Sequence, residues 1–247
     1  MRPMRKLLLF LALAATAAQA ASPEPPVVLV TGTRITLDWP YAVLEAGMAA
    51  FEEERALAPQ AALRFRLLLS PGVAVLDNVA LTLVDGDSLV PVPVTPAGLF
   101  QLDHMRRSAG ASLTVNRNGG QFDGNRTPQP DVRTPGLPDH VRRLGDLRLE
   151  CRVKTAMAKA VLGFLQSFAI SALGGSDWCA PRKGGGYSVD TKLAAAQATL
   201  SHGSRTLVLP ARGAGSVTVP VADPGWADDA LVTFAQAAPQ ALPQAPQ

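Results

Sequence analysis

The sequence has few of the residue types on which most redox, metal and hydrolytic sites depend. It contains two cysteines and three histidines in 247 residues, and aromatic residues make up 5% of it. The two cysteines do not form a C-x-x-C pair, which excludes the usual dithiol redox motif. No H-E-x-x-H, G-x-S-x-G or S-x-x-K motif is present, and no Gly-rich phosphate loop follows a strand. We therefore predict no cofactor, no metal ligands and no catalytic residues from motifs.

Long apolar runs are scarce as well, and the first of them lies in residues 1–20. Basic residues at positions 2–6 precede an apolar run at 7–13, and Ala18-Gln19-Ala20 places small residues at the −3 and −1 positions of a cleavage site. This order is typical of a secretory signal peptide, whose apolar part is too short to span a bilayer. We expect a mature chain that begins at Ala21 and is periplasmic or secreted.

A net charge of one sign is absent once that segment is removed. The chain has 23 basic and 20 acidic residues, and residues 1–20 hold three of the basic residues and none of the acidic ones. A neutral mature chain argues against nucleic acid as a partner. The charges are nevertheless unevenly distributed, because residues 21–102 have a net charge of −5 and residues 103–154 a net charge of +4.

The sequence does contain many short alternating segments that are typical of β-strands. Leu63-Arg64-Phe65-Arg66-Leu67 alternates apolar and charged residues, and the turn signals Asp85-Gly86 and His202-Gly203-Ser204 separate pairs of such segments. Prolines 91, 93 and 96 restrict their segment to a sheet edge or to irregular chain. The further predicted strands are 27–35, 79–84, 89–94, 98–102, 113–115, 146–153, 197–200, 206–209, 216–221 and 231–234.

Two helices are expected between these strands. Asp38 before Pro40 predicts an N-cap, and the apolar spacing that follows predicts an amphipathic helix ending before Pro59. Residues 155–173 predict a second helix that is apolar nearly all round and directly follows the strand at 146–153. Its polar residues argue against a membrane span.

The two cysteines flank the second predicted helix. In an oxidising compartment Cys151 and Cys179 would form one disulfide, which would tie the end of this helix to the strand before it. The predicted fold class is α+β, mainly β. It has an antiparallel, sandwich-like core, an N-terminal amphipathic helix and a disulfide-tethered apolar helix.

The middle of the chain contains a Gly-, Asn- and Pro-rich segment at 116–138, which predicts a long surface loop. Just before it, Val92-Pro93-Val94 followed by Gly98 and Phe100 is similar to part of the small prealbumin-like modules attached to secreted enzymes. This resemblance covers a short segment and implies no function. We expect one exported domain over 21–234, with the boundary at 124–138 if there are two, and a flexible Ala/Pro/Gln tail at 235–247.

Four arginines are the main candidates for a binding site. Arg106-Arg107 and Arg142-Arg143 flank the predicted loop and could clamp an anionic group such as a phosphate, a sugar acid or a partner's carboxylates. The alternative is that they pair at the surface with nearby acidic residues, which are Asp103, Asp139 and Asp146.

Two further patterns have an ordinary explanation beside a functional one. Asp85-Gly86-Asp87-Ser88 offers alternating oxygen ligands that calcium favours, but it also fits a hairpin turn. Trp39, Trp178 and Trp226 lie near turn signals, where they either anchor loops or together line a sugar-binding surface.

These observations favour a non-catalytic exported protein that binds an envelope protein or an anionic ligand. An exported hydrolase or carbohydrate-active enzyme is one alternative, and it would need a cleft that gathers His104 or His202 with Asp or Ser side chains. A carrier of an apolar ligand is the other, and it would need an internal cavity beside the apolar helix. Fold class alone does not choose among the three.

Overall fold

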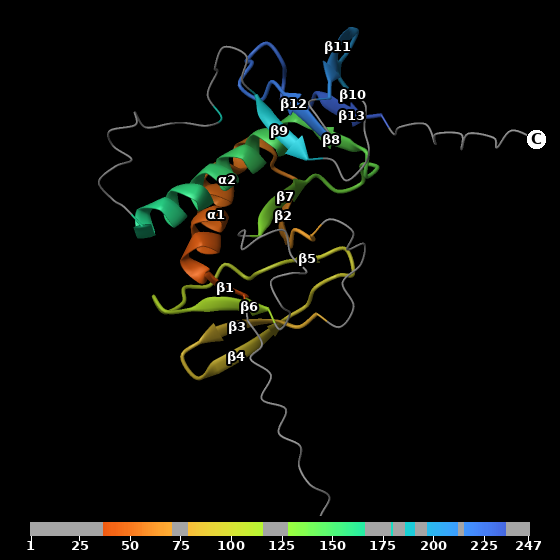
Figure 1. Ribbon diagram of the computed structural model, residues 1–247. Helices are drawn as coiled ribbons and strands as arrows, with labels where there is room; N and C mark the ends of the chain where they lie inside the picture. The colour runs from red at the N-terminus through yellow and green to blue at the C-terminus, as the bar shows by residue number, and fades with distance from the viewer. Residues whose placement is uncertain are drawn as a thin grey trace, which may run out of the picture. The chain divides into compact units, whose positions relative to one another are not determined.

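The structure is a computed structural model that describes residues 37–70, 79–115, 128–165, 179, 186–190, 197–211 and 215–235. Its helices are α1 (Tyr41–Glu53), the 3-10 helix η1 (Arg55–Leu57) and α2 (Leu144–Leu165) (Figure 1). Its strands are β1 (Leu37–Pro40), β2 (Ala62–Arg66), β3 (Leu81–Asp85), β4 (Ser88–Val92), β5 (Leu99–Phe100), β6 (Ser112–Val115), β7 (Gln129–Arg133), β8 (Val141–Arg143), β9 (Tyr187–Asp190), β10 (Gln197–His202), β11 (Arg205–Pro210), β12 (Ser216–Val219) and β13 (Leu231–Phe234). All of these elements lie in one compact unit, Arg34–Gln247.

In the part of the chain that the structure describes, the strands pair into four antiparallel sheets. Their strand orders are β1-β6-β3-β4, β11-β10-β13-β8, β5-β2-β7 and β12-β9. The α+β, mainly β, class is therefore confirmed. The sandwich-like arrangement and the single domain over 21–234 stay predictions.

Two hairpins occur where the turn signals predict them. β3 and β4 are joined at Gly86, and β10 and β11 at Gly203. Both glycines have a φ of 58°, a left-handed conformation that glycine adopts without a steric penalty. Asp85-Gly86-Asp87-Ser88 is thus a hairpin turn, and β4 with Pro91 lies at a sheet edge, as its prolines predict.

The first helix begins at a different point from the one predicted. Residues Leu37–Pro40 form β1, which pairs with β6, and Pro40 precedes the helix without a side-chain cap. Asp38 is not a cap, because its Oδ1 accepts a hydrogen bond from Thr114 Oγ1 at 2.6 Å across the strand pair. The pairing of β1 with β6 thus places Asp38 opposite Thr114 instead of at the N-terminus of α1. The side chains that α1 buries are Tyr41, Val43, Leu44, Met48 and Phe51.

The expected strand at 146–153 is wrong, because these residues form the first half of α2. The backbone N–H groups of Leu144 and Gly145 donate to Ala230 O and Asp228 O, each at 2.8 Å, which fixes the start of the helix. Gly145 lies so close to Leu57 O that a Cβ there would overlap it. Within the described residues, the predicted helix at 155–165 is the second half of a helix that begins at Leu144.

The two helices pack against each other, as Figure 1 shows. A Cβ at Gly47 of α1 would lie 2.7 Å from Met157 Cγ, so glycine permits the close approach. α2 contributes to two buried clusters. Leu149 and Val153 belong to the cluster around α1, β2, β3 and β6, and Leu144 and Leu147 belong to the cluster around β10, β12 and β13.

One arginine of α2 holds the turn that precedes β13. Arg148 donates to three backbone oxygens, at 2.7 to 2.9 Å, and forms an ion pair with Asp228. The three acceptors belong to Val221, Asp223 and Trp226. α2 is thereby joined to residues about 75 positions further along the chain.

The predicted long loop at 116–138 contains a strand. Residues Gln129–Arg133 form β7, which pairs with β2 in the register Arg64↔Asp131. β7 is an edge strand, and Val132 directs its backbone N–H and C=O away from β2. Pro130 lies two residues earlier in the strand, so its backbone groups also face away from β2. The missing N–H of Pro130 therefore removes no bond to β2.

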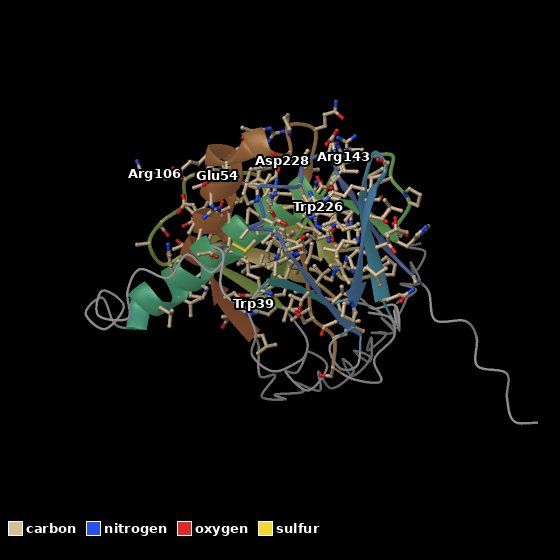
Figure 2. All side chains as sticks on the ribbon, turned by 90° about the horizontal axis from the view of Figure 1, so that it is seen from above. Trp39, Glu54, Arg106, Arg143, Trp226 and Asp228 are labelled. Atoms are coloured by element: carbon tan, nitrogen blue, oxygen red, sulfur yellow. A yellow bond between two sulfur atoms is a disulfide. The ribbon has the colours of Figure 1, made fainter. Side chains whose placement is uncertain are left out.

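The predicted disulfide between Cys151 and Cys179 is present (yellow bond in Figure 2), with a Cα–Cα distance of 5.9 Å. Cys151 lies in the third turn of α2 and not in a strand, so the bridge holds the helix from its middle. Several expectations fall outside the described residues: the signal peptide at 1–20, the strand at 27–35, the helix end at 166–173, Trp178 and the tail from 236 onward.

Candidate functional site

The four arginines predicted from the sequence do not lie together. Arg106 is exposed on the loop between β5 and β6, and Figure 2 shows it well apart from Arg143. Arg142 and Arg143 are consecutive residues of β8 and so point to opposite faces of the strand. Of the four arginines, Arg142 lines the cleft described next, and it is buried there.

That cleft, called the arginine cleft below, has a volume of about 460 Å³ and lies between β2, β7, α2 and β9. Five of its lining residues are basic and three are acidic. The basic ones are Arg64, Arg66, Arg133, Arg142 and Lys154, and the acidic ones are Asp131, Asp139 and Glu150. Apolar residues line it as well, among them Leu68, Leu99, Val189 and Phe234.

The floor of the cleft is the charged face of the β2–β7 pair. Because side chains alternate along a strand, Arg64 and Arg66 share one face, while Phe65 and Leu67 enter the core on the other. The register places Asp131 directly across from Arg64. Asp131 accepts hydrogen bonds from Arg64 Nη2 at 2.7 Å, Arg66 Nη2 at 3.2 Å and Arg133 Nε at 3.3 Å. One carboxylate thus orders three guanidinium groups.

A buried ion pair forms the wall of the cleft next to β7. Arg142 Nη2 donates to Glu150 Oε2 at 2.7 Å, and the two side chains are 5% and 8% exposed. The same Nη2 donates to Val132 O at 2.7 Å, and Val132 N donates to Glu150 Oε2 at 3.0 Å. Arg142 and Glu150 therefore satisfy the outer edge of β7 in the way that another strand would.

The acidic residues of α2 continue this pattern along β7. Asp146 accepts from Thr134 N at 2.9 Å and from Thr134 Oγ1 at 2.7 Å. Four residues of helix rise about 6 Å, and two residues of strand span about 6.6–6.8 Å, so the acids at 146 and 150 match the amides of residues 134 and 132. The next positions in this series are Lys154 and residue 130. Residue 130 is proline, which has no N–H to offer a further acid.

Tyr187 of β9 closes the cleft on the side of α2. Its hydroxyl donates to Glu150 Oε1 at 3.0 Å, and the ammonium group of Lys154 lies 5.5 Å from the centre of its ring. Lys154 forms no ion pair with any residue that the structure describes. Its charge is thus available to the cleft.

The ionisation of the floor reflects this charge balance. Burial acts to raise the pKa of Asp131, but the neighbouring guanidinium groups, that of Arg66 first, more than offset burial and hold the pKa below the ordinary 3.8. Burial lowers the pKa of Arg133, and the charge of Arg142 lowers it further despite Asp131. Arg133 therefore lies in a partly buried site beside a second guanidinium group.

The arginine of the buried pair, Arg142, is charged. Burial would lower the pKa of Arg142, but the charge and hydrogen bond of Glu150 raise it above its usual value. The Nε of Arg142 is buried and has no hydrogen-bond partner among the described residues. Arg142 is thus charged, but its Nε–H has no hydrogen-bond acceptor among the described residues.

The histidines do not meet in the arginine cleft. His202 Nε2 lies 3.1 Å from Asp229 Oδ1, and both side chains are largely exposed. His104 lines a second hollow of about 300 Å³ with Asp103 and Glu52. This is the combination of His104 with an Asp that the enzyme alternative needs, but the described lining of the hollow contains no Ser, Thr or Cys. Within the described ranges, no group of three or more His, Cys, Asp or Glu side chains could hold a metal ion.

The tryptophans that the structure describes do not form a sugar-binding surface. Trp39 and Trp226 are 4% and 2% exposed. Arg205 lies over the Trp226 ring, 3.9 Å from its centre, so this tryptophan anchors the turn before β13.

Comparison with protein families, with characterised proteins and with solved structures finds no match to this chain. Among the described residues, no helix is both long enough and apolar enough to cross a membrane.

Sequence reasoning missed most of the cleft. The alternation at 63–67 places Arg64 and Arg66 on one face, which is a signal for a charged floor. Asp131 and Arg133 show the same spacing within a segment interpreted as loop. Glu150 and Lys154 are separated by one helical turn, a signal hidden by the interpretation of 146–153 as a strand.

Proposed function

We propose that this is an exported, non-catalytic binding protein that takes an anionic small molecule in the arginine cleft. The observation that carries the proposal is the excess of two positive charges in a cleft whose acidic side chains Asp131 and Glu150 are already paired. An anion is the ligand that would complete this set of donors.

The cost of the arrangement supports a binding role. Burying an ion pair is weak evidence for stability, because apolar residues of similar volume often stabilise a fold as well or better. Arg64 and Arg66 each donate to Asp131 through Nη2 and remain partly exposed. The other N–H donors of each guanidinium group can therefore reach a ligand. Preordered guanidinium groups bind an anion with little loss of side-chain entropy.

The apolar part of the lining defines the rest of the ligand. Leu68, Leu99, Val189 and Phe234 lie in the same cleft, whose volume is in the range of small-molecule sites. A ligand with an anionic group and a short apolar body would use both kinds of surface. This also separates the proposal from a carrier of a purely apolar ligand, for which five cations in the lining would be unfavourable.

Export is supported by two features. Residues 1–20 have the order of a signal peptide, and the disulfide is of the kind that persists in an oxidising compartment. We propose a periplasmic or secreted location on these grounds.

The test uses three probes that share a six-carbon body and differ in charge: hexanoate, hexanamide and hexylamine. We expect hexanoate to raise the melting temperature of the mature chain and to shift NMR signals of the cleft, while the other two bind at least tenfold more weakly. Because the attraction is electrostatic and Arg64 and Arg66 are partly exposed to solvent, the affinity for hexanoate should fall as salt is added. Arg66→Gln should weaken hexanoate binding, and Arg55→Gln, which alters an exposed arginine outside the cleft, should not.

Two results would reject the proposal. One is equal binding of hexanoate and hexanamide, which would make the site apolar. The other is the absence of binding by any anion at low salt, including hexanoate and hexyl phosphate.

A further inference from the structure

We infer that the ligand of the arginine cleft carries two negative charges, one held by Arg64 and Arg66 and the other by Lys154. This inference rests on the proposed function and specifies its ligand class as a dianion with separated charges and an apolar body between them.

The anchor at the β2 end is the pair Arg64–Arg66. Asp131 holds both guanidinium groups on one face of the strand pair, at 2.7 Å and 3.2 Å, and so fixes where an anion would meet their remaining donors. Neither arginine is buried as deeply as Arg142, whose side chain is occupied by Glu150 and Val132. The first charge of the ligand belongs at this open end.

The second anchor follows from the match between α2 and β7. Acids at 146 and 150 accept the outward amides of residues 134 and 132. Pro130 ends this series because proline has no backbone N–H, so an acidic side chain at position 154 would find no amide hydrogen to accept. The helix has Lys154 at that position, and this lysine lines the cleft with its ammonium group 5.5 Å from the centre of the Tyr187 ring. We therefore assign its charge to the ligand rather than to the strand.

The charge count of the cleft agrees with two anchors. Five basic and three acidic side chains line it, so a singly charged ligand would leave one positive charge unmatched and a dianion would leave none. The two anchors lie on different elements, β2 and α2, and we expect the two charges to be separated along the ligand.

The experiment compares straight-chain dicarboxylates, from glutarate to suberate, with monocarboxylates of the same carbon number at low salt. For the wild-type protein we expect the best dicarboxylate to bind about tenfold more tightly than its matched monocarboxylate. Lys154→Gln should weaken the binding of the dicarboxylate much more than that of the monocarboxylate and so bring this ratio to about one. Arg66→Gln should weaken the binding of both series. Lys159→Gln, on the exposed side of the same helix, is the matched control and should retain the tenfold ratio.

Hexyl phosphate distinguishes two separated charges from two charges at one end. If it binds as tightly as the best dicarboxylate and Lys154→Gln does not weaken it, both charges are held together and the two-anchor assignment is wrong. The assignment is also wrong if the dicarboxylate preference is absent from the wild type or persists in Lys154→Gln. Each of these results still includes anion binding, whereas a failure of every anion to bind rejects the proposed function itself.

Discussion

Replacing Glu150 by alanine should destabilise the protein more than any other single change at the cleft. The carboxylate of Glu150 accepts from Arg142 Nη2, Val132 N and Tyr187 Oη, and its side chain is 8% exposed. After the substitution, Arg142 stays buried and charged, and the amide of Val132 has no acceptor.

The expected size of the effect follows from these losses. Removing one member of a buried ion pair costs about 3–5 kcal/mol, mainly because the other charge is left uncompensated. An orphaned buried amide adds about 1–3 kcal/mol when nothing replaces its acceptor, and the two losses overlap because both arise from one carboxylate. We expect the free energy of unfolding to fall by about 4 kcal/mol, equivalent to about 8–16 °C in melting temperature for a chain of this size.

The assay is equilibrium unfolding in urea at neutral pH, with two comparison variants. Glu52→Ala breaks the exposed i,i+3 pair with Arg55 and should cost no more than about 1 kcal/mol. Arg142→Met combined with Glu150→Leu removes both buried charges and should be less destabilised than Glu150→Ala alone. Its remaining loss reflects the backbone groups of Val132, which would then have no side-chain partner.

Equal losses of unfolding free energy for Glu150→Ala and Glu52→Ala would contradict this prediction. That result would mean that the pair is solvated and does not close the edge of β7. A double variant less stable than Glu150→Ala would also contradict the assignment of the penalty to an uncompensated arginine.

Three further predictions concern ionisation, the disulfide and the helix glycines. Because the folded-state pKa of Asp131 lies below its unfolded value of 3.8, its stabilisation is present above pH 3.8 and is lost as the pH falls through the folded pKa. Wild-type protein should therefore lose more unfolding free energy below pH 3.8 than Asp131→Asn, and equal losses in urea titrations would contradict this. The bridge Cys151–Cys179 closes a loop with a sequence separation of 28, so reduction should lower the unfolding free energy by about 3–4 kcal/mol, a change that calorimetry with and without reductant can detect. Gly145→Ala should lower the melting temperature through overlap with a backbone oxygen, whereas Gly163→Ala, in open space on the same helix, should raise stability by about 1 kcal/mol; a stabilising Gly145→Ala would refute the close approach.

The parts of the fold set by local chemistry could be predicted from the sequence. The alternation at 63–67 gave β2 and its two faces, and the glycines at 86 and 203 gave both hairpins. Each of these depends on residues that are neighbours in the chain. Pro91 in an edge strand belongs to the same class, because proline lacks the N–H that a second neighbouring strand would need.

The first half of α2 resembles a strand in sequence because apolar residues at 147, 149, 151 and 153 alternate with charged ones. Asp146, Arg148, Glu150, Arg152 and Lys154 are spaced by two, which resembles a half-buried strand. On a helix, two residues correspond to about 200°, so the five charges divide into one row at 146, 150 and 154 and another at 148 and 152. The first row faces β7 and the cleft, and Arg148 of the second row holds the turn before β13. A helix buried on several sides can therefore show the pattern of a strand.

The cleft could be predicted only in part, since its residues meet through long-range pairing. Arg142 was identified by its charge, but its partner Glu150 and the floor around Asp131 depend on the register of β2 with β7 and on the match of α2 with β7. Neither follows from local spacing. Arg106 belongs to an arginine pair just as Arg142 does, but it lies on the loop between β5 and β6, outside the cleft lining.

The closure of β7 by side chains has a consequence for solubility. β7 is the edge strand of its sheet, and an unprotected edge is a template for pairing with another molecule. Here the outward N–H groups of Val132 and Thr134 donate to carboxylates of α2, so these amides are not available to pair with a strand of a second chain. That protection exists only while α2 is docked. During synthesis the chain makes β7 before α2, so the strand is exposed to intermolecular pairing until the helix has formed and taken up its amides.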